Sequence, residues 1–204
     1  MLERTAAAVY FNLWPTVLTL IRHHNEVSRI EELGLFMSLQ SPAKLNWAAF
    51  ENTLVRLTIA EVERFATKHA GETFCGFAFD CNSQYGEVGL CAETNGFERA
   101  SRWELGCWEY QGFNRKVFDQ AWRGFQAVIT ARCVGEEEDR RTFMTPTQSR
   151  FMDAVCRVLV RLEVRGAFDV FKRAGNFATL ALDHHESVFS AQARLRRIRR
   201  EGGG

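Results

Sequence analysis

The sequence predicts an α+β fold, in which a small antiparallel sheet packs against several helices. Residues 46–68 repeat apolar side chains at helical spacing, and residues 73–92 alternate with a period of two around a polar turn. Helical spacing returns from residue 116 onwards. Because the helices and the hairpin do not alternate as strand–helix–strand units, we expect an α+β arrangement rather than a parallel α/β sheet.

The first well-marked helix begins after Asn46, a residue type that is favoured as an N-cap. Apolar residues then recur on one face, and the helix is expected to end before Gly71. Upstream, residues 17–36 predict one or two shorter helices. We expect a single domain over residues 1–204, with residues 1–42 as an N-terminal helical extension.

A hairpin is predicted at residues 73–92. Its strands cover residues 73–80 and 85–92, and Asn82, Ser83 and Gln84 supply the turn. A third strand is predicted near residues 176–183, and we expect it to complete the small antiparallel sheet. The segment at 102–110, which is rich in Trp and Glu, lies between these strands in the sequence.

Three further helices are expected. Residues 116–132 form the first, and a charged surface loop follows at 135–141. The second has the clearest start in the chain, because Thr145, Pro146 and Gln148 form a capping-box pattern; Gly166 is expected to end or bend it. The last covers residues 187–200 and ends in a basic run at 194–200, interpreted as a solvated face.

The composition argues against several classes of protein. A net charge of +1 gives no general attraction to nucleic acid or to an anionic membrane. The six cysteines include no C-x-x-C pair, and most stand in apolar segments, so we expect free thiols in a reducing cytoplasm. The apolar stretch at residues 6–20 is too short and interrupted for a membrane span, which needs about 20 apolar residues.

Residues 183–186, Asp-His-His-Glu, contain side chains that can bind a metal ion. Adjacent residues at a strand end point to opposite sides, so His184 and His185 need a bend to share one ion. Further ligands would have to come from elsewhere, such as His69 or Asp80. We interpret the stretch as a polar surface loop, and we expect no metal or cofactor.

Glu104 and Glu109 flank Trp108, and a carboxyl group beside Trp can have a raised pKa that suits general acid catalysis. No second catalytic group is evident, and the other interpretation is that the aromatic residues pack on the sheet. A small hydrolase or metal-dependent enzyme that uses Glu104/Glu109 or His184/His185 is one alternative function. A structural subunit of a larger assembly, suggested by the apolar N-terminus, is another.

The order of these motifs resembles a bacterial family. Thr-Phe-x-x-Phe-Ala-Phe-Asp stands at 73–80, a Gly-Glu-Val strand ends in Glu-Thr-Asn at 93–95, and Arg-Trp-x-x-x-x-Trp-Glu-Tyr stands at 102–110. Together with residues 166–186, this order is similar to the bacterial domain of unknown function numbered 4303. The similarity covers roughly residues 46–190. Members are encoded near polymorphic toxins and secreted effectors.

The resemblance implies a cytoplasmic immunity protein, not an enzyme, that binds a cognate toxin or effector and blocks its active site. It implies no catalytic residues and no cofactor, and we expect neither nucleic acid nor membrane as a partner. We expect the partner-binding residues at the turn and in the Trp-rich segment: Asn82, Gln84, Tyr85, Trp103, Glu104, Trp108, Glu109 and Tyr110.

Overall fold

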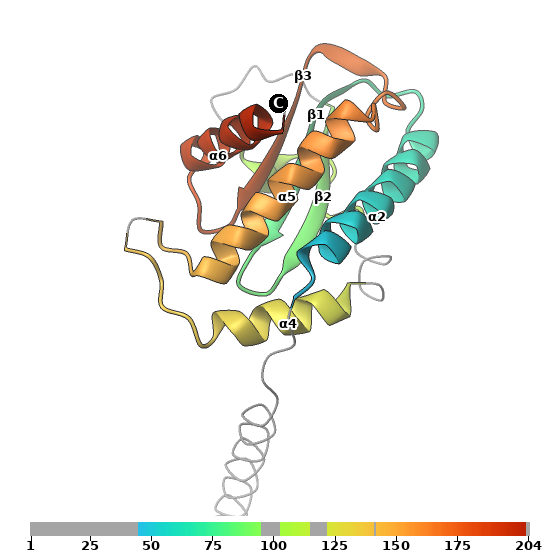
Figure 1. Cartoon of the computed structure of the whole chain (residues 1–204). Helices are drawn as coiled ribbons and strands as arrows, with labels where there is room; N and C mark the ends of the chain where they lie inside the picture. The colour runs from blue at the N-terminus through green and yellow to red at the C-terminus, as the bar shows by residue number, and fades with distance from the viewer. Residues whose placement is uncertain (1–44, 95–102, 115–121, 141, 203–204) are drawn as a thin grey trace, which may run out of the picture. The chain divides into compact units, whose positions relative to one another are not determined.

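The computed structural model describes residues 45–94, 103–114, 122–140 and 142–202. These residues form the helices α2 (Trp47–Lys68), α4 (Arg123–Cys133), α5 (Pro146–Val164) and α6 (Val188–Glu201), shown in Figure 1. The strands are β1 (Phe74–Asn82), β2 (Glu87–Glu93) and β3 (Arg173–Asp183), and a short 3-10 helix, η1, covers Leu105–Cys107. The predicted α+β class is confirmed.

The sheet has the strand order β2-β1-β3 and is mixed. β1 and β2 form the predicted antiparallel hairpin, in which Asp80 lies opposite Gly89. β3 runs parallel to β1, with Ala78 opposite Leu180. The expectation of a wholly antiparallel sheet was therefore wrong for the third strand.

The parallel pairing follows from the path of the chain between β2 and β3. Parallel neighbours need a long crossover connection, usually a helix. The 19 residues of α5 span about 28 Å at the usual helical rise. They return the chain to the end of the sheet where β1 begins, and there the Phe74 N–H donates to the Lys172 carbonyl at 2.9 Å. Periodicity within each segment does not report this long-range return, so the direction of β3 was missed.

Local signals set the helix ends where the sequence predicts them. At the start of α2, Asn46 Oδ1 accepts a hydrogen bond from the Ala49 N–H at 3.0 Å. At the start of α5, Thr145 and Gln148 form the predicted capping box. Gly166 follows α5 with a φ of +67°, a left-handed conformation that favours glycine after a helix.

Two predicted segments lie partly or wholly outside the described residues. The helix expected at 116–132 is described from its later part onwards, where α4 begins at Arg123. The N-terminal extension expected at 1–42 is not among the described residues.

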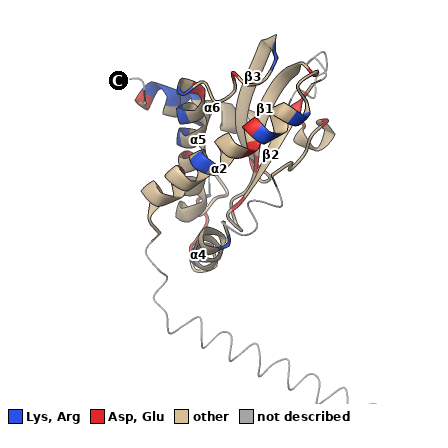
Figure 2. Ribbon diagram, turned by 90° about the vertical axis from the view of Figure 1, so that its right-hand side faces the viewer, with Lys and Arg blue, Asp and Glu red and all other residues tan. Residues whose placement is uncertain are grey.

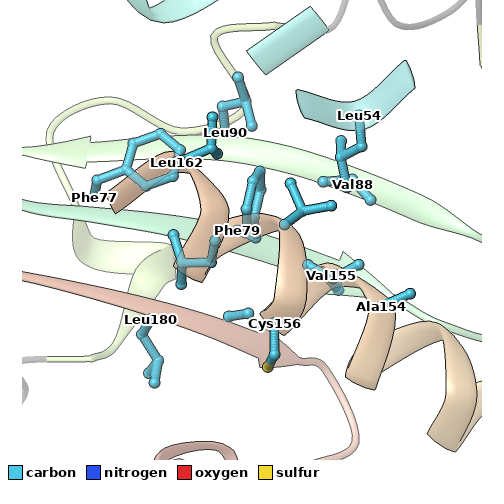
Figure 3. Close-up of a cluster of buried hydrophobic side chains, with 14 of the residues drawn as sticks. Leu54, Phe77, Phe79, Val88, Leu90, Ala154, Val155, Cys156, Leu162 and Leu180 are labelled. Carbon is cyan, nitrogen blue, oxygen red and sulfur yellow. The ribbon is translucent and has the colours of Figure 1, made fainter. Parts of the chain in front are cut away.

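One face of the sheet packs against α2 and α5 and carries most of the core. Phe77 and Phe79 of β1 and Leu90 of β2 are fully buried there, against Val155 and Leu162 of α5 (Figure 3). Each such side chain stabilises the fold by about 1.5–3 kcal/mol through its burial. α4 lies across one end of the sheet, and α6 lies on the β3 side (Figure 1).

The opposite face is covered by the Trp-rich segment around η1. Trp108 packs against Ala78, Cys91 and Leu105 in a small second cluster. The ring of Trp103 follows, with its centroid 5.8 Å from that of Trp108. Because Ala78 and Cys91 are small, the indole ring can lie directly on the sheet. The predicted packing of these aromatic residues on the sheet is confirmed.

The cysteines are free thiols, as the sequence predicts, and all except Cys107 are buried. Burial raises the pKa of the Cys156 thiol to about 12. In the part of the chain that the structure describes, every helix is too short or too polar to cross a lipid bilayer.

A buried carboxylate fastens the end of β3 to the turn between β1 and β2. Asp183 is 1% exposed, and it accepts hydrogen bonds from the Ser83 N–H at 2.8 Å and from the His185 N–H at 3.0 Å. Each of these backbone donors needs an acceptor where water cannot supply one. Asp183 therefore holds together the turn after β1 and the loop after β3, which leave the sheet at the same end.

We expect Asp183→Ala to lower the free energy of unfolding by about 2–3 kcal/mol, because two backbone donors lose a charged acceptor. Urea unfolding followed by Trp fluorescence measures this loss. The matched control is Asp169→Ala, which removes an exposed carboxylate paired with Arg173 at 2.7 Å. That variant should lose less than about 1 kcal/mol. Equal losses in the two variants would contradict the role assigned to Asp183.

Candidate functional site

The register of the sheet brings four polar side chains to the face opposite α5. Asp80 and Asn82 stand two residues apart on β1, and Glu87 lies opposite Asn82. Leu182 lies opposite Asp80, and His184 follows two residues later. Since side chains on one face recur every second residue, Asp80, Asn82, Glu87 and His184 share this face.

These four side chains line a cavity of about 370 Å³. Its other lining residues are Val88, Gly89, Gln111, Gly112, Asn114, Trp122 and Gln126. The cavity lies between the turn after β1 and residues 111–114, which follow the Trp-rich segment; Asn82 is the one predicted partner-binding residue in its described lining. We name it the acceptor pocket, after the carboxylate and amide oxygens that it presents.

Two buried side chains hold the wall of the acceptor pocket. Asn114 Oδ1 accepts from the Leu90 N–H at 2.7 Å, and its Nδ2 donates to the Val88 carbonyl at 3.0 Å. The amide of Asn114 thereby replaces a neighbouring strand at the outer edge of β2. Trp122 Nε1 donates to the Gly86 carbonyl at 2.8 Å, which ties the hairpin turn to the start of α4. These bonds preorganise the pocket.

The remaining groups of the pocket are mainly acceptors. Asp80 Oδ1 lies 3.1 Å from His184 Nε2. The carboxylate of Glu87 is exposed and has no hydrogen bond or ion pair with any residue that the structure describes. Asn82 Oδ1 is buried and has no hydrogen-bond partner among the described residues. The described lining includes no Lys or Arg, so the pocket favours a positively charged group.

The pocket can recognise a cation, and the Asp80–His184 contact lies within it. The Asp80–His184 pair has the contact that general acid–base catalysis needs. The described lining has no Ser, Thr, Cys or Lys that could serve as a nucleophile. In the four described ranges, no group of three His, Cys, Asp or Glu side chains could hold a metal ion.

The side chains of residues 183–186 diverge. The first carboxylate faces the hairpin turn, and His184 faces Asp80. Glu186 turns the other way and pairs with Arg194 at 2.5 Å. Burial raises the pKa of Glu186, although Arg194 opposes this shift. The predicted polar loop thus contributes to two separate contacts, the His184–Asp80 hydrogen bond and the Glu186–Arg194 ion pair.

The predicted partner-binding residues fall into different environments. Asn82 lines the acceptor pocket and Trp108 is buried. The exposed members are Gln84, Tyr85, Glu104 and Glu109, and the half-buried ones are Trp103 and Tyr110. Tyr110 pairs with Ala92, which lies about 16 Å along β2 from Glu87. The turn and the Trp-rich segment therefore lie at opposite ends of β2, and the acceptor pocket separates them.

Sequence reasoning missed Glu87, Gln111 and Gln126 as pocket residues. Glu87 could have been found from the hairpin alone, because a two-residue alternation places it on the same face as Asp80 and Asn82. Gln111 and Gln126 had no such signal, since a loop and a separate helix bring them to the cavity.

Tyr110 anchors the end of the Trp-rich segment to the loop after α2. Its hydroxyl donates to Glu72 Oε2 at 2.7 Å, and His69 Nδ1 lies 2.8 Å from Glu72 Oε1. The hydrogen bond to Glu72, aided by burial, raises the pKa of Tyr110 to about 12. The hydrogen bonds from His69 and Tyr110 lower the pKa of Glu72. This cluster is a structural link, and it lies outside the acceptor pocket.

Comparisons with protein-family models, with curated proteins and with solved structures find no match to this chain. The resemblance drawn from the sequence motifs therefore stays a prediction. The geometry of the acceptor pocket is the main structural guide to function.

We expect Glu72→Gln to lower the pKa of Tyr110 from about 12 towards its ordinary value of 10.0, because the charged acceptor is lost. The folded pKa lies above the unfolded one, so this hydrogen bond stabilises fully below pH 10.0 and its contribution is lost as the pH rises through about 12. Tyrosinate absorbance against pH measures the shift, and Tyr110→Phe identifies the transition among the three tyrosines. The same titration in wild type and Glu72→Gln would contradict the assignment.

Proposed function

We propose that this protein is an immunity protein, a cytoplasmic binder that neutralises a cognate bacterial toxin or secreted effector by covering its active site. The observation that carries the proposal is the acceptor pocket. It combines the carboxylates of Asp80 and Glu87 with the unpartnered Asn82 Oδ1, and its described lining has no basic residue except His184. An Arg or Lys side chain of the toxin would satisfy these acceptors.

The charge of the pocket suits the blocking of an active site. Enzymes that act on nucleic acids and other phosphorylated substrates bind them with Lys and Arg side chains. An acidic pocket on the inhibitor complements such a site and also accelerates association. The motif resemblance supports the same function, because its family is encoded near toxins.

The hairpin turn, which lies between the pocket residues Asn82 and Glu87 in the sequence, offers a further contact. Tyr85 is 47% exposed at the hairpin turn, beside Gln84. Exposed Tyr residues are frequent anchors of protein interfaces, since they bury a large area and lose few rotamers. The turn that carries them is held by Asp183 and Trp122, so little order must be gained on binding.

The second candidate function is an acid–base hydrolase, which the Asp80–His184 contact of 3.1 Å favours. Two observations make it the weaker candidate. The His184 side chain is 51% exposed, so it is not shielded from water. Glu104 and Glu109 do not line the acceptor pocket and cannot supply its second catalytic group. The third alternative, a structural subunit, depends on residues 1–42 and lies outside the described chain.

The direct test is co-expression with the product of the adjacent gene. We expect a one-to-one complex on size-exclusion chromatography and loss of the toxin's activity when the proteins are mixed. His184→Ala should still neutralise the toxin, because binding needs the carboxylates and not an acid–base pair. If the adjacent gene encodes no toxin-like protein and pull-downs recover no partner, the proposal fails.

We expect Glu87→Lys to weaken the complex by about 30-fold or more, because it places a cation where the toxin presents one. Isothermal titration calorimetry measures the dissociation constant. Glu138→Lys is the matched control, since it makes the same charge change on the exposed loop before α5, outside the acceptor pocket. Equal affinities of the two variants would exclude the acceptor pocket as the binding site.

A further inference from the structure

The last turns of α5 expose an apolar face that the core does not use. Val164 is 83% exposed, and Val160, one helical turn earlier on the same face, is half-buried. α5 lies between α2 and α6 in the helical layer that covers the sheet (Figure 1). An 83% exposed side chain is not covered by either neighbouring helix. The end of α5 therefore offers apolar surface to a partner.

Two cavities flank this end of α5. One, of about 350 Å³, lies towards α2 and is lined by Asn52, Val55, Arg56, Ile59, Arg161 and Arg165. The other, of about 380 Å³, extends from the same two α5 arginines past Val160 and Val164 to Ile198 of α6. Because Arg161 and Arg165 line both cavities, the two adjoin along α5. We name the surface that they form the helical groove.

The floor of the helical groove is apolar and is built by three helices. Val55 of α2 and Ile198 of α6 are each 3% exposed, so they fix the floor in the core. Ile59 and Val160 are half-buried beside them. Apolar side chains of a partner that packed here would bury the surface that these residues and Val164 leave in contact with water.

The acidic residues of the helical groove are already paired. Glu51 Oε1 lies 2.8 Å from Arg157 Nε, and Glu51 Oε2 lies 3.6 Å from Arg161 Nη1. Glu201 pairs with Arg197 of its own helix at 3.1 Å. The remaining charge of the groove is therefore positive, and Figure 2 shows basic residues on all three of its helices.

That remaining charge comes from Arg56 and Arg165. Both side chains are exposed, and neither makes an ion pair or a side-chain hydrogen bond with any residue in the described ranges. They line the same cavity, whose described lining includes no Asp or Glu. Arg165 stands at the negative end of the α5 dipole, which can account for it. Arg56 stands in the middle of α2, where no helix end accounts for it.

We propose that the helical groove binds an acidic, amphipathic helix of a partner protein. Apolar side chains of that helix would pack on Ile59, Val160 and Val164, and its carboxylates would pair with Arg56 and Arg165. A helix suits this surface because helices present side chains in ridges and grooves, whereas their backbone groups are already hydrogen-bonded within the helix. The groove shares no lining residue with the acceptor pocket, so this inference does not depend on the function proposed above.

Charge selects against a second copy of this chain as the occupant. Two copies that paired symmetrically through the helical groove would bring the same patch, with its Arg56 and Arg165 side chains, against itself. Like charges placed against each other across an interface cost binding energy. An acidic helix meets the same surface with favourable charge.

The test uses the full chain and a fluorescein-labelled helical peptide, in which Leu recurs at every third or fourth position and Glu and Ala occupy the others. The charge control is the same peptide with Lys in place of Glu. Fluorescence polarisation should show saturable binding of the Leu/Glu peptide only. Its affinity should fall as the salt concentration rises, because exposed charges are screened.

The first matched pair of variants tests the charge. Arg56→Glu should weaken binding of the Leu/Glu peptide by about tenfold or more. Arg123→Glu makes the same change at an exposed position on α4, outside the described lining of both cavities, and should alter binding by less than about threefold.

The second matched pair tests the apolar contact. Val164→Ser should weaken binding by about fivefold, because the peptide loses apolar surface against which to pack. Val134→Ser is the control, since Val134 is 81% exposed at the end of α4 and lies outside both cavities. It should change binding by less than about twofold. All four positions are at the surface, so the variants should unfold in urea close to wild type.

Four results would overturn the proposal. They are no binding of the Leu/Glu peptide, equal binding of the Leu/Lys peptide, equal losses within the charge pair, and equal losses within the apolar pair. Concentration-dependent dimers that form without peptide and are abolished by Val164→Ser would identify a second copy as the occupant and would also overturn it.

Discussion

β1 is paired on both edges and covered on both faces as far as Phe79, and the rest of the described fold is arranged around this strand. Its Phe77 and Phe79 side chains face α2 and α5, whereas Ala78 and Asp80 face the other way. A slip of one residue in register would place Asp80 in the helical core, at the large cost of burying an unpaired charge. The alternation of large and small side chains along β1 therefore determines which layer covers each face.

The same alternation produces the acceptor pocket. On the second face, the small Ala78 lies under Trp108, and that cluster does not extend to Asp80 or Asn82. Gly89 stands opposite Asp80, and a Cβ added there would lie 3.4 Å from the Asp80 carbonyl oxygen. Because Gly89 has no side chain, an open space remains above the sheet beside Asp80 and Asn82. The pocket exists because the Trp-rich segment covers β1 at Ala78 but does not extend to the polar residues Asp80 and Asn82.

Local parts of the structure could be predicted from the sequence, and long-range parts could not. The caps at Asn46 and Thr145 and the hairpin depend on residues a few positions apart, so their signals stand within short windows. The direction of β3 depends on the crossover through α5, and no short window contains it. The acceptor pocket is of the second kind, because the Asp80–His184 contact joins distant parts of the chain. The sequence suggested these two residues only as candidate ligands of one metal ion, in an interpretation that was not favoured, and not as a hydrogen-bonded pair.

The near-neutral net charge of +1 conceals an uneven distribution of charge over the described residues. Most of the Arg residues of α6 pair with acidic residues of α5, as Arg197 does with Asp153 at 2.6 Å and Arg199 does with Glu163 at 2.6 Å. The Arg side chains of the basic run other than Arg194 are exposed, as the predicted solvated face requires, and several of them also pair with acidic residues of α5. Exposed charges are screened beyond about 8–10 Å. A partner therefore interacts with the local electrostatic field at its binding site and not with the net charge of the chain. At the acceptor pocket that local field is set by Asp80 and Glu87, because the described lining includes no Lys or Arg.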